Sequence, residues 1–235
     1  MKSKKVILFD LDDTLYDYQS NHIKSLNEVY KILKYDINIS TKKFTQLYEI
    51  SKMEIQIGLI GTASSHNRIL YFQRLVEKIY KKCDFEMIIK LYNTYWDFFL
   101  KNIKPGKGVI KMLRKIKEKG YKTAIITDLT TLIQLKKITK LGFSDYIDVL
   151  VTSEEVGGEK PNPSVFLLAL NKLNALPSDA IMVGDNLIKD IEGGNLLGIS
   201  TILFSNKNGI DYKFDNDYQK PTYLIKDFSE MLKII

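Results

Sequence analysis

Two aspartates, two residues apart, follow the first apolar run of the chain. Residues 5–14 read KVILFDLDDT, so the run ends in Asp10 and Asp12. Residues two apart on an extended backbone share one face, and two carboxylates about 4 Å apart repel by roughly 4 kcal/mol at an effective dielectric near 20. A fold keeps such a pair when it binds a cation or divides acid and base roles between the two groups. The pair therefore predicts a metal site, acid–base chemistry, or both.

Further polar residues follow later apolar runs of the chain. They are Thr127 and Asp128 after residues 121–127, Lys160 after 146–152, and Asp185 and Asp190 around the end of 180–183. Ligands of open parallel sheets bind beyond the carboxyl ends of the strands, so these residues are expected to meet Asp10 and Asp12. Carboxylates with one hydroxyl and one lysine make a hard-cation site beside an anion site. Oxygen ligands without a His or Cys cluster favour Mg²⁺ over zinc.

The elements that must position these residues alternate between strand and helix from residue 104 onward. Apolar runs predict strands at 4–10, 121–127, 146–152, 180–183, 199–204 and 222–225. Apolar residues at helical spacing predict helices at 107–119, 130–141, 164–173, 188–197 and 228–234. Repeated βα units of this kind predict an α/β fold, a doubly wound parallel sheet with helices on both faces.

Residues 18–100 break this alternation because they predict helices only. The expected helices cover 20–34, 41–55, 66–82 and 84–100, and their aromatic residues are expected to pack in a small helical core. We therefore predict an α/β core formed by residues 1–16 and 104–235, interrupted by an inserted all-helical cap domain at 17–103. The linkers are expected near 15–18 and 102–106.

Four motifs together resemble those of one family. They are DLDDT at 10–14, the threonine of AIIT at 127, Lys160 in EKPNP, and GDNLIKD at 184–190. In this order and at these strand ends, they resemble the haloacid dehalogenase superfamily phosphatases with a helical cap after the first motif (subfamily I). The segment SEEVGGEKPNP at 153–163 also resembles the branch that holds N-acylneuraminate-9-phosphatase and archaeal phosphatases.

The resemblance implies a reaction on phosphate esters. Asp10 would be the nucleophile that forms an aspartyl-phosphate, and Asp12 would protonate the leaving alcohol and then deprotonate the hydrolytic water. Thr127 and the backbone N–H of Asp128 would hold phosphate oxygens, and Lys160 would pair with the phosphate and Asp10. The side chain of Asp128 is expected to point away from the phosphate, because it would repel it.

The resemblance also implies a bound Mg²⁺ as cofactor. Its ligands would be Asp10, the backbone carbonyl of Asp12, Asp185 and Asp190. Dehalogenases of the same superfamily lack an acid at the position of Asp12, so this residue favours phosphoryl chemistry. A phosphomutase or phosphotransferase would keep both carboxylates and stays open. A protein that holds phosphate for signalling without turnover is the third alternative.

Substrate choice is expected to lie with the cap. The turn at 58–68, GLIGTASSHNR, offers His66 and Arg68 as substrate-binding residues. The alternative is that His66 caps the following helix and that Arg68 is solvated. Tyr16 and Tyr18 lie in the predicted hinge and are expected to line the entrance.

Net charge, apolar run length and cysteine content limit the kinds of partner that we expect. The net charge is +7, from 35 Lys and Arg against 28 Asp and Glu, without a basic tail or motif, so we expect no nucleic-acid partner. No apolar run reaches the roughly 20 residues that span a bilayer. The single cysteine, Cys83, suits a reducing compartment. We expect a cytoplasmic monomer or homodimer acting on a small phosphorylated metabolite.

Overall fold

The computed structural model describes residues 5–205 and 212–235. Its strands are β1 (Val6–Phe9), β2 (Lys122–Thr127), β3 (Val149–Thr152), β4 (Ala180–Gly184), β5 (Ser200–Phe204) and β6 (Tyr223–Ile225). They form one parallel sheet in the order β3-β2-β1-β4-β5-β6. The chain runs outward from β1 to β3 and then returns beside β1 with β4, which is the switch point where such sheets bind ligands. The predicted doubly wound parallel sheet is confirmed.

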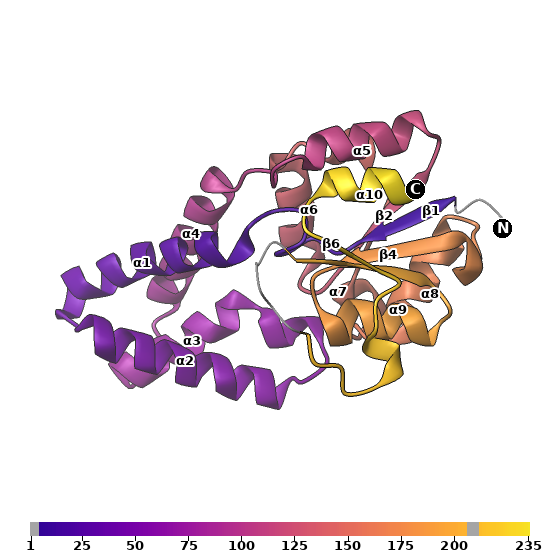
Figure 1. Cartoon of the computed structure of the whole chain (residues 1–235). Coiled ribbons are helices and arrows are strands. Elements are labelled where there is room, and N and C mark those ends of the chain that lie inside the picture. Colours follow the sequence, from indigo (N-terminus) through magenta and orange to yellow (C-terminus); the bar gives the residue numbers. More distant parts are fainter. Residues whose placement is uncertain (1–4, 206–211) are drawn as a thin grey trace.

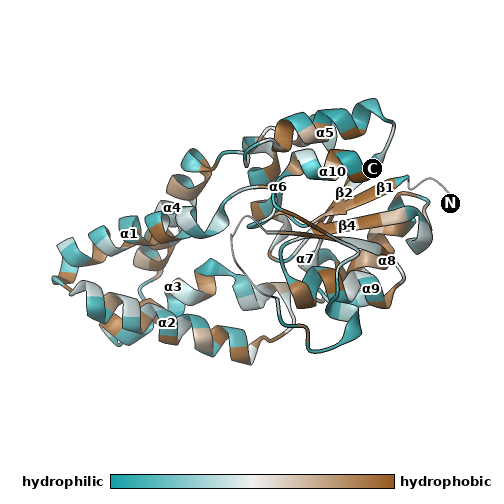
Figure 2. Ribbon diagram, viewed as in Figure 1, coloured by the Kyte–Doolittle hydropathy of each residue, from teal (hydrophilic) through white to brown (hydrophobic). Residues whose placement is uncertain are grey.

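Helices cover both faces of this sheet (Figure 1). They are α5 (Val109–Glu118), α6 (Thr131–Lys140), α7 (Ser153–Val156), α8 (Pro163–Lys172), α9 (Gly193–Leu196) and α10 (Phe228–Ile234). Alternate residues of each strand point to opposite faces, so Ile7 and Phe9 join the apolar core beneath α5 and α10. Val6 and Leu8 join a second core beneath α8. Figure 2 shows the strands mostly apolar and the outer helices divided between apolar and polar residues.

The remaining long helices lie together beyond the carboxyl end of β1 (Figure 1). They are α1 (Tyr18–Ile37), α2 (Thr41–Gly58), α3 (Arg68–Tyr80) and α4 (Phe85–Asn102). The side chains of Asp17, Ser40, Asn67 and Asp84 cap their amino ends by accepting backbone N–H groups. Buried rings such as Tyr48, Phe72, Tyr95 and Phe99 fill the space between them. These are the four helices expected from the sequence, while the division into domains at residues 17 and 103 stays a prediction.

The two linkers to this helical segment lie side by side. The N–H of Gly106 donates to the carbonyl of Leu15 at 2.9 Å. A Cβ at Gly106 would lie only 3.1 Å from that carbonyl oxygen, so the absence of a side chain permits the close approach. The side chain of Asp13 accepts the N–H groups of Tyr18 and Gln19 and so fixes where α1 begins. The first linker is therefore held by the same turn that carries Asp10 and Asp12.

Two predicted elements differ from the structure. The strand expected at 146–152 begins only at Val149, because Ser144–Tyr146 forms a 3₁₀ turn (η2). The helix expected at 188–197 is a π-helical segment (η4, Leu187–Glu192) followed by α9. Short 3₁₀ turns also occur at Ala63–His66 (η1), Pro177–Asp179 (η3) and Asp217–Gln219 (η5). Residue 4, where the first strand was predicted to begin, lies outside the described residues.

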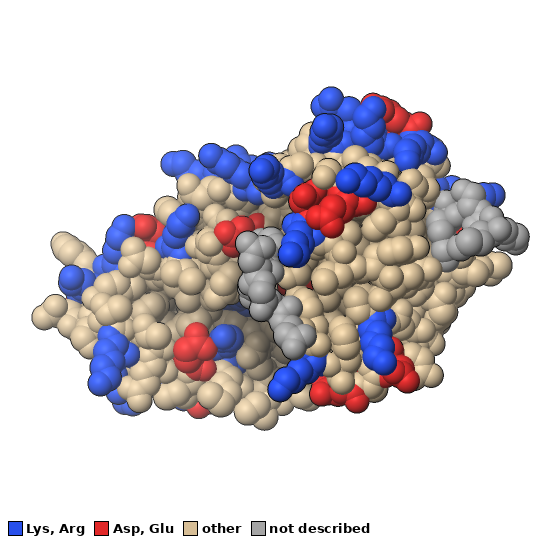
Figure 3. All heavy atoms as spheres, viewed as in Figure 1, with Lys and Arg blue, Asp and Glu red and all other residues tan. Residues whose placement is uncertain are grey.

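Lys and Arg side chains are spread over several elements on the face drawn in Figure 3, with Asp and Glu among them. Across residues 5–205 and 212–235, no helix is long and apolar enough to cross a membrane.

Candidate active site

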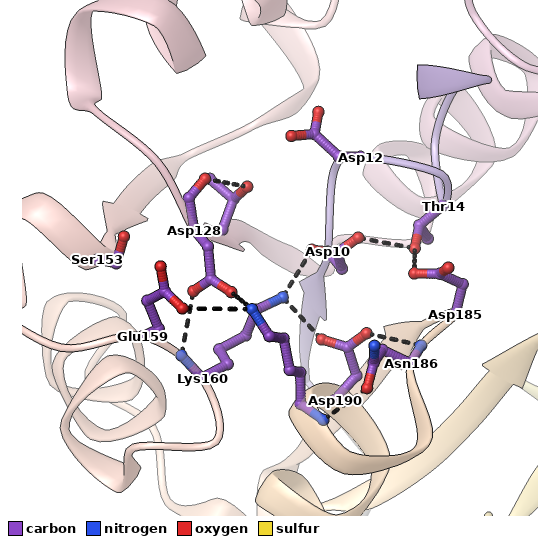
Figure 4. Close-up of polar contacts among 12 residues, drawn as sticks. Asp10, Asp12, Thr14, Asp128, Ser153, Glu159, Lys160, Asp185, Asn186 and Asp190 are labelled. Carbon is purple, nitrogen blue, oxygen red and sulfur yellow. Dashed lines mark hydrogen bonds and ion pairs between the residues drawn. The ribbon is translucent and has the colours of Figure 1, made fainter. Parts of the chain in front are cut away.

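Asp10, Lys160 and Asp190 form a buried ionic cluster at the carboxyl edge of the sheet (Figure 4). Lys160 Nζ lies 2.6 Å from Asp10 Oδ1 and 2.7 Å from Asp190 Oδ1. Burial alone would lower the pKa of Lys160, but the charges of Asp10 and Asp190 raise it above its ordinary value. Lys160 therefore stays protonated and offers a fixed cation next to the Asp10 carboxylate.

Three carboxylates of this edge can share a metal ion. Oxygens of Asp10, Asp185 and Asp190 lie within 4.8 Å of one another. Thr14 Oγ1 donates to Asp10 Oδ2 at 2.9 Å and lies 3.3 Å from Asp185 Oδ1. Burial, together with the neighbouring charges of Asp190 and Asp185, raises the pKa of Asp10 well above its usual range. Burial of its carboxylate and the charge of Asp190 raise the pKa of Asp185 to about 7, although the residue is exposed at the rim. These shifts mark a cluster of negative charge that a hard divalent cation fits, since all three donors are carboxylate oxygens.

Gly184, the last residue of β4, permits this arrangement. A Cβ there would lie 2.3 Å from both Cγ and Oδ2 of Asp190, closer than heavy atoms can approach. The Asp190 carboxylate is also held by the backbone N–H of Asn186 at 3.1 Å. Only glycine at the end of β4 leaves room for Asp190 to turn back over the strand.

Asp12 has a separate set of partners. Lys137 Nζ lies 2.8 Å from each of its carboxylate oxygens, Tyr16 Oη donates to Oδ1 at 2.5 Å, and Gln134 Nε2 lies 3.4 Å from Oδ2. Figure 4 shows the Asp12 carboxylate pointing away from the cluster of Asp10, Lys160 and Asp190. Although both aspartates line one cavity, their carboxylates sit in different electrostatic surroundings. The two carboxylates therefore have different partners, which allows them to take different roles.

Thr127 and Asp128 are positioned by neighbours from two helices. Gln134 Nε2 donates to Thr127 Oγ1 at 2.6 Å and to the carbonyl of Asp128 at 2.8 Å. The Asp128 carboxylate accepts the backbone N–H of Lys160 at 3.1 Å and pairs with Lys189 Nζ at 2.7 Å. Its negative charge is thus partly compensated within the protein, while the expectation that this side chain points away from a bound phosphate stays a prediction.

The turn between α2 and α3 docks on the loop that carries Lys160. Glu159 accepts Ser65 Oγ at 2.7 Å and lies 3.2 Å from His66 Nε2, and its backbone N–H donates to Gly61 at 2.9 Å. Asn67, not His66, caps α3, so the alternative role of His66 as a cap is wrong. Arg68 is buried rather than solvated, with 8% of its surface exposed. Both residues line the same cavity as Asp10, which has a volume of about 250 Å³.

The structure adds residues that sequence reasoning missed. They are Thr14, Gln134, Lys137, Glu159 and Lys189. Gln134 and Lys137 had a detectable signal, because they are three residues apart and share the buried face of α6 with Ile133 and Ile138. A polar residue on the apolar face of a helix needs a buried partner. Glu159 lies in a loop and Lys189 in the short π-helical segment η4, so neither belongs to an α-helical pattern that could have marked it.

Comparisons with known proteins agree with this geometry. The sequence family described as haloacid dehalogenase-like hydrolase matches residues 7–204. A ribulose-1,5-bisphosphate 5-phosphatase of Halopiger xanaduensis is 38% identical over 202 residues, which are 84% of this chain and 83% of that one. A glyceraldehyde 3-phosphate phosphatase of Methanopyrus kandleri is 30% identical over 238 residues, with 98% and 97% covered.

The expected branch and fold are also confirmed. N-acylneuraminate-9-phosphatase of Homo sapiens is 27% identical over 214 residues, covering 88% of this chain and 84% of that one. The crystal structure of a haloacid dehalogenase-type phosphatase from Thermococcus onnurineus superposes with a TM-score of 0.74 at 26% identity, covering 98% of this chain and 97% of that one. Since the family match spans most of the chain and carries every motif of the site, the protein belongs to the haloacid dehalogenase-like hydrolases.

Proposed function

We propose that the protein is a Mg²⁺-dependent phosphatase that hydrolyses small phosphomonoesters through an aspartyl-phosphate on Asp10. The observation that carries the proposal is the buried Asp10 carboxylate beside Lys160, with Asp12 held apart on Lys137. Relatives named as phosphatases of ribulose bisphosphate, glyceraldehyde 3-phosphate and N-acylneuraminate 9-phosphate support the same reaction class.

The first half of the proposed reaction transfers the phosphoryl group to the enzyme. An oxygen of Asp10 forms a bond to phosphorus while the ester P–O bond breaks, and Asp12 gives its proton to the leaving alcohol oxygen. Lys160, Thr127 and the N–H of Asp128 hold the other phosphate oxygens and stabilise their charge. These proposed roles require Asp12 to be protonated and Asp10 to be ionised when the substrate binds, so the substrate and the metal ion must help to set these states.

The second half releases phosphate. Asp12, now ionised, accepts a proton from a water molecule whose oxygen bonds to phosphorus, and the bond from Asp10 to phosphorus breaks. Asp10, Asp185, Asp190 and the backbone carbonyl of Asp12 would hold Mg²⁺. When bound, the ion neutralises the clustered carboxylates and the charge on the phosphoryl oxygens.

The same proposal assigns parts to the two regions of the chain. Residues 1–16 and 104–235 carry the reaction, and residues 17–103 act as a cap that excludes water and selects the leaving group. The contact of Ser65 and His66 with Glu159 supports this, because it seats the helical segment on the catalytic loop. A cytoplasmic location is part of the proposal, supported by a single cysteine in the whole sequence.

The test is an assay with p-nitrophenyl phosphate in the presence of Mg²⁺ and, separately, of EDTA. We expect release of p-nitrophenol that EDTA abolishes, that falls below detection in Asp10→Asn, and that persists in Asp145→Asn, an exposed aspartate outside the site. Full activity in Asp10→Asn would overturn the assigned nucleophile. Absence of release by the wild type, in a preparation that isomerises a sugar phosphate, would favour a mutase instead.

A further inference from the structure

Arg68, the first residue of α3, lines two cavities at once. One is the active-site cavity of about 250 Å³ that contains Asp10, Lys160 and Asp185. The other lies among α1, α2 and α3 and has a volume of about 490 Å³. Arg68 shares this double position with Tyr18 and His66. A molecule held at Asp10 and extending toward the helical segment therefore meets Arg68.

Arg68 differs in its pairing from the lysines of the site. Lys160 pairs with Asp10 and Asp190, Lys189 with Asp128 and Glu159, and Lys137 with Asp12. Within the described part of the chain, Arg68 has no carboxylate within 4.0 Å. Its Nε is buried and has no hydrogen-bond partner there. A buried cation without a counter-ion is costly, and an anion bound next to this guanidinium would offset that cost.

The groups around Arg68 orient the guanidinium without neutralising it. Nη1 donates to the carbonyl of His66 at 2.5 Å, Nη2 donates to the hydroxyl of Tyr18, and the ring centre of Tyr71 lies 5.0 Å from Cζ. Carbonyl, hydroxyl and aromatic faces all stabilise a cation but carry no full negative charge. The positive charge of Arg68 also acts on a neighbouring residue, because burial and this charge together lower the pKa of His22 to about 3.

We propose that Arg68 binds a second anionic group of the substrate, a phosphate or carboxylate at the end opposite the phosphate attacked by Asp10. This rests on the proposed phosphatase function and names its substrate class: small molecules with an anionic group at each end, such as bisphosphates and phosphorylated acids. Arginine suits this role because its planar N–H groups match the oxygens of both groups. Because both ends lie in one small cavity, the carbon chain between them is short.

Two matched substrate pairs test the proposal. Glyceraldehyde 3-phosphate and 3-phosphoglycerate differ only by an aldehyde or a carboxylate, and ribulose 5-phosphate and ribulose 1,5-bisphosphate differ only by one phosphate. We expect the wild type to prefer the doubly anionic member of at least one pair in kcat/KM. That preference should fall about 10- to 100-fold in Arg68→Met, the effect of losing one charged hydrogen-bonding partner. Arg68→Lys should retain part of the preference. A preference within the glyceraldehyde 3-phosphate pair identifies the second group as a carboxylate, and a preference within the ribulose pair identifies it as a phosphate.

Arg74→Met is the matched control, since Arg74 lies on the same helix but is exposed and pairs with Glu77. It should keep the wild-type preference. Turnover of p-nitrophenyl phosphate by the wild type without a preference in either pair would overturn the role of Arg68 and leave the phosphatase function standing. An unchanged preference in Arg68→Met would also overturn the role of Arg68 and would leave the phosphatase function standing.

A binding measurement keeps the inference testable if turnover fails. Calorimetry on Asp10→Asn compares the two members of each substrate pair, and the same comparisons are made in Asp10→Asn combined with Arg68→Met. Tighter binding of the doubly anionic member of either pair that depends on Arg68 supports the second anion site. Equal binding within both pairs in Asp10→Asn, or tighter binding that survives Arg68→Met, overturns it. Thermal melting of each variant checks that it is folded.

Discussion

Lys137 donates to both carboxylate oxygens of Asp12 at 2.8 Å from a position with no exposed surface. The rings of Tyr18 and Trp96 lie 5.2 and 5.6 Å from its Nζ, so the ammonium sits between the proposed acid and the aromatic side chains of the helical segment. Burial lowers the pKa of Lys137, against the opposing effect of Asp12. The pair therefore fixes the position of the Asp12 carboxylate next to the helical segment.

Replacing Lys137 should impair the acid step more than the rest of the reaction. In Lys137→Met the carboxylate of Asp12 loses its bidentate partner and its fixed position. We expect kcat/KM to fall about 100-fold for glycerol 3-phosphate, whose alkoxide must be protonated to leave. The fall should be much smaller for p-nitrophenyl phosphate, whose phenolate leaves without a proton.

The ratio of the two losses separates positioning from damage to the fold. Lys136→Met is the control, because Lys136 lies next to Lys137 on α6 but is exposed. Equal losses on both substrates in Lys137→Met would contradict the positioning role.

Gly184→Ala should disturb the metal site through sterics alone. The new methyl group would lie 2.3 Å from the Asp190 carboxylate, which Lys160 and the Asn186 N–H hold in place. We expect the Mg²⁺ concentration for half-maximal activity to rise about tenfold or more, as for other losses of support to metal ligands. Gly58→Ala, where a Cβ meets no atom within 4 Å, should leave the Mg²⁺ requirement unchanged. An unchanged Mg²⁺ requirement in Gly184→Ala would mean that Asp190 is not needed for metal binding.

Much of the fold could be predicted because the local sequence patterns favour the same strands and helices that packing of the folded protein requires. The buried strands are continuous apolar runs, and each is followed by the polar residues that gather at one edge of the sheet. Asp10, Lys160, Asp185 and Asp190 were therefore placed together from the sequence, and the structure brings them together. Their catalytic roles stay predictions.

The rest of the site depends on contacts between distant segments. Lys137 reaches Asp12 across 125 positions of the chain, and Lys189 reaches Asp128 across 61. No local pattern encodes such pairs. The burial of Arg68 was also unpredictable from its own helix, since it depends on rings from α1 and α4 as well as α3. Sequence spacing locates residues on an element, whereas the packing of elements decides which charge is left unpaired.

Mg²⁺ should stabilise the protein more at high pH than at low pH. Burial and the charge of Asp190 raise the pKa of Asp185 from an ordinary 3.8 to about 7, and burial also raises the pKa of Asp10. A raised pKa means stability that is present at low pH and is lost as the pH rises from about 4 through 7. Mg²⁺ removes this loss because it binds the ionised carboxylates.

Melting temperatures in EDTA and in MgCl₂, at pH 5 and at pH 8, check this expectation. The increase caused by Mg²⁺ should be larger at pH 8, and it should shrink in Asp185→Asn but not in Asp145→Asn. An equal increase at both pH values would show that the carboxylates do not form the cation site.

Acid should destabilise the helical segment through His22. Its Nδ1 lies 2.7 Å from the Tyr95 hydroxyl in a buried position, and burial, aided by Arg68, lowers its pKa from 6.5 to about 3. Because the unfolded chain takes up a proton below pH 6.5 and the folded protein does not, stability is present above that pH and is lost on acidification. The loss between pH 7 and pH 4.5 should be about 2–3 kcal/mol.

Urea unfolding at the two pH values measures this loss. His22→Asn removes the titrating ring and keeps a polar atom toward Tyr95, so the variant should lose about 2–3 kcal/mol less than the wild type over the same pH interval. The control is His66→Asn, the other histidine of the chain, which leaves His22 in place and should retain the acid sensitivity that His22 causes. If His22→Asn is as acid-sensitive as the wild type, the buried neutral histidine is not a source of the pH dependence.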